Sequence, residues 1–337
     1  MVRKHYDPLA HGINRRSLLG GMLGGAIAAS ANLTGLDLLQ HPVLANTLKR
    51  NNKRVILLWL AGGASQLETW DPKPGRPTGG PYRAIQTNVP GIQISELMPK
   101  MSQRLQHTAI IRSLNTKIGD HGGGAKLMHL GRRDESNLKL PDLGAMLARE
   151  LRDPDSQAPD YVTYYTATEG RGNAVGQAGF LGSSYAPMFL TTEAIPENLS
   201  RLSGLTASDD QQRADLRALL SRRFSDGRRS RVVGSHDEAY TRVRNLMAGQ
   251  EVFDISNEPQ AIRDLYGPTL FGQQALVARR LVEAGTPFVK ISRAWWDSHG
   301  QNFETHLELV TELDNVMSAL LDDLKSRGML ESTLVIT

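Results

Sequence analysis

Two short segments of this chain combine aspartate and histidine in patterns that could bind a divalent metal ion. The segment Gly119-Asp120-His121-Gly122 places a carboxylate next to an imidazole on a glycine-rich turn. Asp297 and His299 are separated by one residue, so in an extended turn both side chains face the same side and could reach one ion. Because imidazoles favour transition metals, the pattern predicts Zn or a similar divalent ion, which could polarise an ester or activate water.

Each segment also has a second interpretation. A helix-like stretch at 125–130 follows His121, and a helix N-terminus beside glycines favours anions. His121 could then act as a general base or nucleophile instead of a ligand. Alternatively, Asp120 caps the helix and His121 is a surface residue, while Asp297 and His299 belong to the capped start of another helix.

A third segment supplies acids without histidine. Gly62 and Gly63 follow a predicted strand and precede Glu68 and Asp71, and either acid could be a metal ligand. The segment lacks the spacing and the Lys-Ser/Thr pair of a phosphate-binding P-loop. It could equally be a turn in which the acids cap the neighbouring backbone.

A folded domain must hold these segments, and the hydrophobic pattern predicts an α/β fold. Short β-branched runs are continuously apolar, which is typical of parallel strands that are covered on both faces. Helical patterns alternate with them, so we expect an open, mostly parallel sheet with helices on both faces. The predicted strands are 55–60, 108–113, 161–164, 288–292 and 333–336, and the predicted helices are 140–151, 209–224, 271–284 and 303–327.

Two regions do not fit this alternation. The stretch 167–187 is rich in glycine and serine and is predicted to be a long loop, and the arginine-rich stretch 225–235 to be a solvated connection. The candidate segments, by contrast, each follow a predicted strand. Since ligands bind beyond the carboxyl ends of strands in open α/β sheets, we expect Asp71, Asp120, His121, Asp297 and His299 to meet at one edge.

The amino-acid composition excludes several kinds of site and partner. The 337 residues include no Cys, which excludes disulfides, thiolate metal sites and a cysteine nucleophile. The formal net charge is +4, but part of it comes from the N-terminal segment. No stripe of basic and aromatic residues accompanies it, so we expect no nucleic-acid partner.

Residues 1–45 are predicted to be a twin-arginine signal peptide. Arg15 and Arg16 precede an apolar run at 18–29, and the small-residue site Val43-Leu44-Ala45 follows. We expect cleavage after Ala45, with the twin-arginine machinery exporting the folded protein to the periplasm or beyond. The alternative is an uncleaved membrane anchor, although glycines in the run and Asp37 weaken a spanning helix.

Together these motifs resemble an exported bacterial family catalogued as domain of unknown function 1501. The resemblance rests on the twin-arginine leader and on three motifs that cover most of the chain. They are Gly62-Gly63-Ala64-Ser65 running to Trp70-Asp71-Pro72-Lys73-Pro74, Gly119-Asp120-His121-Gly122, and Trp296-Asp297-Ser298-His299-Gly300-Gln301-Asn302-Phe303.

The resemblance implies membership of the alkaline phosphatase and sulfatase-like superfamily, whose members often hold two divalent metals. It implies that Asp71 supplies an acid, that Asp297 and His299 bind metal, and that residues before Ala125 hold the nucleophile. That slot contains His121 instead of Ser, Thr or Cys, and Thr116 is a hydroxyl that lies earlier than expected. The superfamily places further ligands after a strand like 333–336, so we expect the domain, 46–337, to be truncated.

Two functions follow from the resemblance. The first is a metal-dependent hydrolase of phosphate or sulfate esters, with a small-molecule or polysaccharide substrate. The second is an exported binding or scaffold protein on the same fold that has lost the nucleophile, because fold does not fix function.

Overall fold

The computed structural model describes residues 52–337, apart from gaps at 134–136, 154–155, 157, 165–166, 169–170, 173–175, 191–193, 195, 197–200, 202 and 227–230. The predicted signal peptide at 1–45 lies outside the described residues. Within the described part of the chain, no helix is both long enough and apolar enough to cross a membrane.

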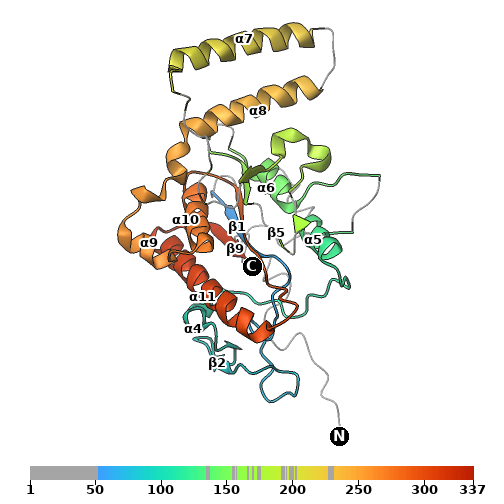
Figure 1. Ribbon diagram of the computed structural model, residues 1–337, viewed down its shortest axis with the longest axis vertical. Helices are drawn as coiled ribbons and strands as arrows, with labels where there is room; N and C mark the ends of the chain where they lie inside the picture. The colour runs from blue at the N-terminus through green and yellow to red at the C-terminus, as the bar shows by residue number, and fades with distance from the viewer. Residues whose placement is uncertain are drawn as a thin grey trace, which may run out of the picture. The chain divides into compact units, whose positions relative to one another are not determined.

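A five-stranded parallel sheet forms the centre of the fold and confirms the predicted α/β class (Figure 1). Its strand order is β7-β4-β8-β1-β9, so β8 and β1 occupy interior positions. Leu57 pairs with Lys290 on one side and Ile336 on the other. The strands are β1 (Arg54–Leu60), β4 (Tyr161–Tyr164), β7 (Met188–Leu190), β8 (Phe288–Arg293) and β9 (Thr333–Ile336).

Helices cover both faces of the sheet, because successive residues of each strand point to opposite sides. Ile56 and Ile291 belong to the main hydrophobic core, which they share with residues of α10 (Leu270–Glu283) and α11 (Asn302–Ser326). The other face packs on α6 (Leu143–Leu151) and α5 (His121–Leu130). Figure 1 shows α10 and α11 on one side of the strands and α5 and α6 on the other.

Capping residues set where the helices begin. Asp120 accepts a hydrogen bond from the Gly123 amide, so α5 begins at His121, four residues earlier than the pattern indicated. Asp142 caps α6 in the same way. Before α7 (Ala207–Ser225), Thr206 is the cap and Asp209 completes a capping box, so this helix begins two residues earlier than predicted.

The predicted strand at 108–113 is wrong. This segment forms no strand and runs over the surface, where the Ile111 side chain is 69% exposed. The Arg112 guanidinium fixes it there by donating hydrogen bonds to the carbonyl oxygens of Trp70 and Gln93. Its apolar residues therefore lack the cover on both faces that a central parallel strand requires.

Smaller elements complete the described structure. Short strands and 3-10 turns lie within 167–187, where a loop was predicted, and α8 begins at Arg231 inside the predicted solvated connection. The remaining helices are α4 (Pro99–Ser102), α8 (Arg231–Ala248) and α9 (Gln260–Tyr266). The remaining strands are β2 (Ala84–Gln86), β3 (Gln93–Ser95), β5 (Ala167–Thr168) and β6 (Arg171–Gly172). The 3-10 turns are Leu105–His107, Gly179–Leu181, Ser183–Tyr185, Gln250–Phe253 and Ile255–Asn257.

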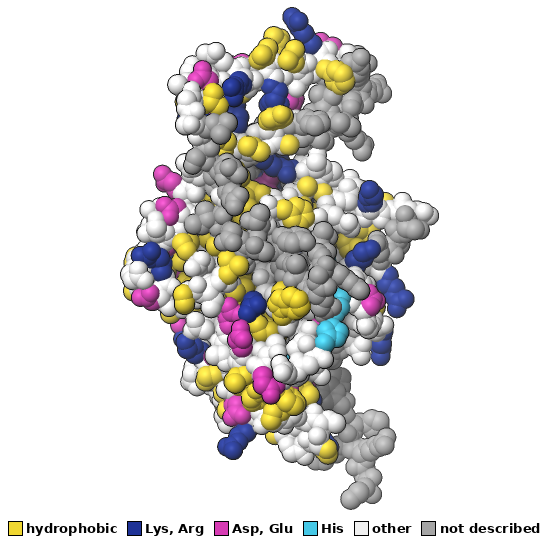
Figure 2. Space-filling model, viewed as in Figure 1, with side chains coloured by type: hydrophobic (Ala, Val, Ile, Leu, Met, Phe, Trp, Pro, Cys, Tyr) yellow, Lys and Arg dark blue, Asp and Glu magenta, His cyan; other side chains and the backbone are white. Residues whose placement is uncertain are grey.

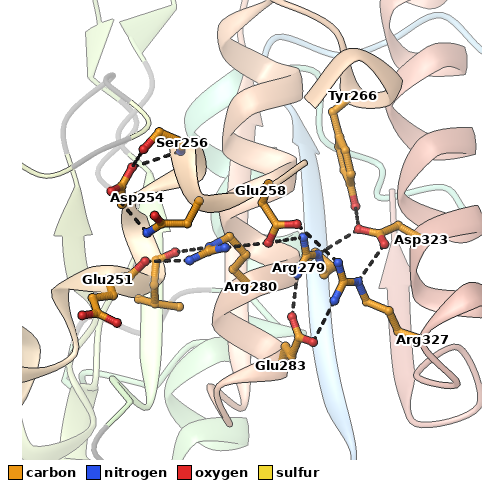
Figure 3. Close-up of polar contacts among 12 residues, drawn as sticks. Glu251, Asp254, Ser256, Glu258, Tyr266, Arg279, Arg280, Glu283, Asp323 and Arg327 are labelled. Carbon is orange, nitrogen blue, oxygen red and sulfur yellow. Dashed lines mark hydrogen bonds and ion pairs between the residues drawn. The ribbon is translucent and has the colours of Figure 1, made fainter. Parts of the chain in front are cut away.

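A buried ion network joins α10 to the C-terminal end of α11 (Figure 3). The Arg279 side chain is fully buried, and its Nε and Nη2 atoms lie 2.8 and 2.7 Å from carboxylate oxygens of Asp323 and Glu258. Arg280 donates to Glu258 as well. Burial raises the pKa of the Glu258 carboxyl, but its contacts with the two arginines outweigh burial and hold that pKa below the ordinary value.

Candidate metal centre

Three of the predicted ligands converge on one point. The Nε2 atom of His121 lies 2.9 Å from Oδ2 of Asp297, and the Nε2 atom of His299 lies 3.1 Å from the same oxygen. All three ligand atoms lie within 4.8 Å of one another. Two imidazoles directed at one carboxylate oxygen form a compact set of donors that a single cation could bind.

Two segments that are far apart in the sequence supply these residues. His121 is the first residue of α5, directly after its Asp120 cap. Asp297 and His299 lie in the turn between the carboxyl end of β8 and the start of α11. This turn is strained, because Trp295, His299 and Gln301 have φ angles of 71°, 54° and 49° in the left-handed region. Such strain often accompanies functional sites, since it fixes side chains in place.

The β1 end supports the turn through its backbone. The Trp296 amide donates to the Ala61 carbonyl, and a Cβ atom on Gly62 would lie only 2.6 Å from the Asp297 nitrogen. Gly62 therefore allows the β1 loop to lie against the turn that carries Asp297 and His299.

Replacing Gly62 with alanine is expected to disturb Asp297. Gly63→Ala is a matched control, because both glycines have a φ of 114° but a methyl group on Gly63 would meet nothing within 4 Å. Both variants should lose about 1–3 kcal/mol of unfolding free energy from backbone strain. Gly62→Ala should lose about 1–3 kcal/mol more from the clash and should bind zinc about tenfold more weakly. Urea unfolding and zinc titration measure both effects, and equal zinc affinities in the two variants would contradict this role.

A buried histidine fastens the other side of the turn. His306 is fully buried in α11, and its Nε2 atom accepts a hydrogen bond from the Ser65 amide at 3.1 Å. Its Nδ1 atom lies 2.9 Å from the Asn302 carbonyl oxygen, and its ring packs edge-on against Trp296. Both nitrogens are occupied by backbone groups, so His306 positions the turn and the β1 loop.

The structure does not bring the other candidates into this group. Asp71 pairs with Lys73 at 2.6 Å and approaches Arg112 at 3.5 Å. Asp120 is occupied by capping α5. The Thr116 hydroxyl contacts the backbone of Ile118.

Buried polar groups lie between the sheet and the helices that carry the site, and the sequence motifs did not reveal them. Burial lowers the pKa of Lys290 on β8 to about 8, although the Asp142 charge opposes this shift. Burial also raises the pKa of Asp142, and hydrogen bonds from Ala145, Tyr161 and Gln177 oppose it. Burial, assisted by the Lys290 charge, lowers the pKa of His129 to about 3, so this α5 histidine is neutral. The available signal was Lys290, which stands between the apolar residues Val289 and Ile291 of β8.

The donor set fits a divalent transition metal. Two histidine nitrogens and a carboxylate oxygen match the ligands of catalytic zinc sites, which have three protein ligands and an open position. The His299 side chain is 67% exposed, so the group is open to solvent from that side.

Comparison with known proteins gives one match. A family model described as "Protein of unknown function (DUF1501)" matches residues 52–337. No curated protein and no solved structure gives a significant match.

Proposed function

The chain belongs to the DUF1501 family, and we propose that it is an exported, metal-dependent hydrolase of phosphate or sulfate esters. The proposal includes the alkaline phosphatase and sulfatase-like architecture that the sequence motifs imply. The observation that carries it is the convergence of His121 and His299 on one carboxylate oxygen of Asp297.

The position of this group supports a catalytic role. Asp297 and His299 follow the carboxyl end of β8, which is where open α/β sheets bind their ligands. His121 begins α5, and the positive end of the helix dipole there favours an anionic ester. A metal ligand set and an anion-attracting helix end thus meet at one place.

We propose the following roles for the residues of this group. His121, Asp297 and His299 would hold the ion, which when bound would polarise an ester oxygen and lower the pKa of a water molecule. The Gly123 amide already donates to Asp120, so other backbone amides in the first turn of α5 would orient the anionic group of the substrate. Because His121 directs its Nε2 atom at Asp297, we assign it as a ligand and not as the nucleophile.

Export by the twin-arginine route is part of the proposal. The pair Arg15-Arg16 and the apolar run after it support a periplasmic or secreted location. The export machinery would be a partner. Because this route carries folded chains, it suits a protein that binds its metal before export. An uncleaved N-terminal anchor is the alternative.

The second candidate is an exported binding or scaffold protein. It is favoured by the position of Thr116, the hydroxyl that the resemblance offered for the nucleophile, because this hydroxyl contacts the backbone of Ile118. Such a protein could bind metal without turnover.

The two candidates differ in turnover. The purified protein, treated with chelator and then reloaded with zinc, is assayed with 4-nitrophenyl phosphate and 4-nitrophenyl sulfate. A hydrolase should release nitrophenol only when zinc is present and should lose the activity on His299→Ala. Zinc binding without turnover of either ester would exclude this activity and favour the scaffold.

A further inference from the structure

A cleft lined by arginines lies between α7 and α8, on elements that contribute nothing to the metal centre. It has a volume of about 500 Å³, which is within the usual range of small-molecule sites. Its charged and aromatic lining residues are Arg201, Arg213, Arg217, Arg244, Asp210 and Tyr240. Four guanidinium groups and one carboxylate line the cleft, so the lining carries a net positive charge, which Asp237 offsets in part through its pair with Arg217.

Three of the four arginines are held in place but retain hydrogen-bond donors. Arg217 pairs with Asp237 and stacks on the Tyr240 ring, with its guanidinium carbon 4.3 Å from the ring centre. Arg201 pairs with Asp210, and Arg244 donates to Gln211 at 2.8 Å. Each guanidinium group has five N–H donors, and each of these polar contacts uses a single nitrogen. The remaining donors are available to a ligand.

The packing of α7 leaves the cleft open. Ala214 and Ala218 lie on the half-buried side of α7, whereas Leu216, Leu219 and Leu220 are 48–58% exposed. Small side chains at the contact with α8 leave space between the helices. Figure 2 shows basic and hydrophobic side chains together over this hairpin.

We propose that this cleft binds a ligand that carries more than one phosphate or sulfate group. Planar guanidinium groups bind such oxyanions through paired hydrogen bonds, and several of them around one cavity favour a ligand with several anionic groups. Binding at this cleft does not depend on the proposed hydrolase, because it uses none of the metal-binding residues.

Isothermal titration of the chelator-treated protein with tripolyphosphate tests this proposal without any contribution from a bound metal. We expect saturable binding that weakens as salt is added. Arg213→Gln and Arg244→Gln should each weaken it about tenfold. Arg223→Gln, which changes an exposed arginine of α7 outside the cleft, should change it less than about twofold.

Parallel titrations with dextran sulfate and uncharged dextran distinguish a sulfated polymer from a small phosphate ligand. Circular dichroism checks that each variant keeps its helices, and Arg213→Gln serves alone if Arg244→Gln unfolds the hairpin. Absence of saturable binding to both anions, or equal weakening by all three substitutions, would overturn the proposal.

Discussion

Replacing His121 or Asp297 with alanine is expected to lower the affinity for Zn²⁺ by more than about a hundredfold. Changes to residues that only orient metal ligands already cost about 10–100-fold, and these two residues would bind the ion directly. Asp297 is the centre of the group, because both imidazole nitrogens approach its Oδ2 atom. Titration of chelator-treated variants with zinc against a competing indicator measures the loss.

The control for this prediction is His107→Ala. His107 is an exposed histidine of the short turn Leu105–His107, and it contacts Lys325 and not the group formed by His121, Asp297 and His299. This substitution should leave zinc affinity unchanged. If His107→Ala and His121→Ala weaken binding equally, the zinc is bound elsewhere on the surface.

Arg279→Met is expected to destabilise the protein by about 3–5 kcal/mol. The substitution keeps a long apolar stem but leaves Asp323 and Glu258 buried without their central cation (Figure 3). Breaking a buried ion pair from one side costs about this much because the remaining carboxylates lose their central cation, and Arg280 and Arg327 compensate them only in part. Urea unfolding at neutral pH, followed by circular dichroism, gives the change in unfolding free energy.

Arg149→Met provides the comparison for Arg279→Met. Arg149 pairs with Glu150 on α6, but its side chain is 52% exposed. Exposed pairs contribute little, so this variant should change stability by less than about 1 kcal/mol. A loss below about 1 kcal/mol for Arg279→Met would show that the network contributes little to the fold.

The central strands could be predicted from sequence because their apolar runs are continuous. The runs at 161–164 and 333–336 have the bounds of β4 and β9, and 55–60 differs from β1 by one residue. The run at 108–113 looks similar, but Arg112 fastens it to the surface near Trp70. Local composition cannot distinguish these cases, because the difference lies in what packs against the segment.

Part of the candidate site could also be predicted from the sequence, and the rest depends on contacts between distant segments. His121, Asp297 and His299 were identified from their residue types. Asp297 and His299 do follow the strand predicted at 288–292, whereas the strand expected before His121, at 108–113, does not form. Asp71 was not brought to the group because Lys73 and Arg112 occupy its carboxylate, and Arg112 is distant in sequence. The buried set of Lys290, Asp142 and His129 was missed because three separate elements contribute to it.

X-ray absorption spectroscopy of the zinc-loaded protein tests the central claim most directly. We predict about one zinc ion per chain, with two imidazole ligands at about 2.0–2.1 Å and oxygen ligands that include Asp297. The imidazole signal should fall to one ligand in His299→Ala. A protein that binds no zinc after chelator treatment and reloading, or a spectrum without imidazole ligands, would contradict the claim.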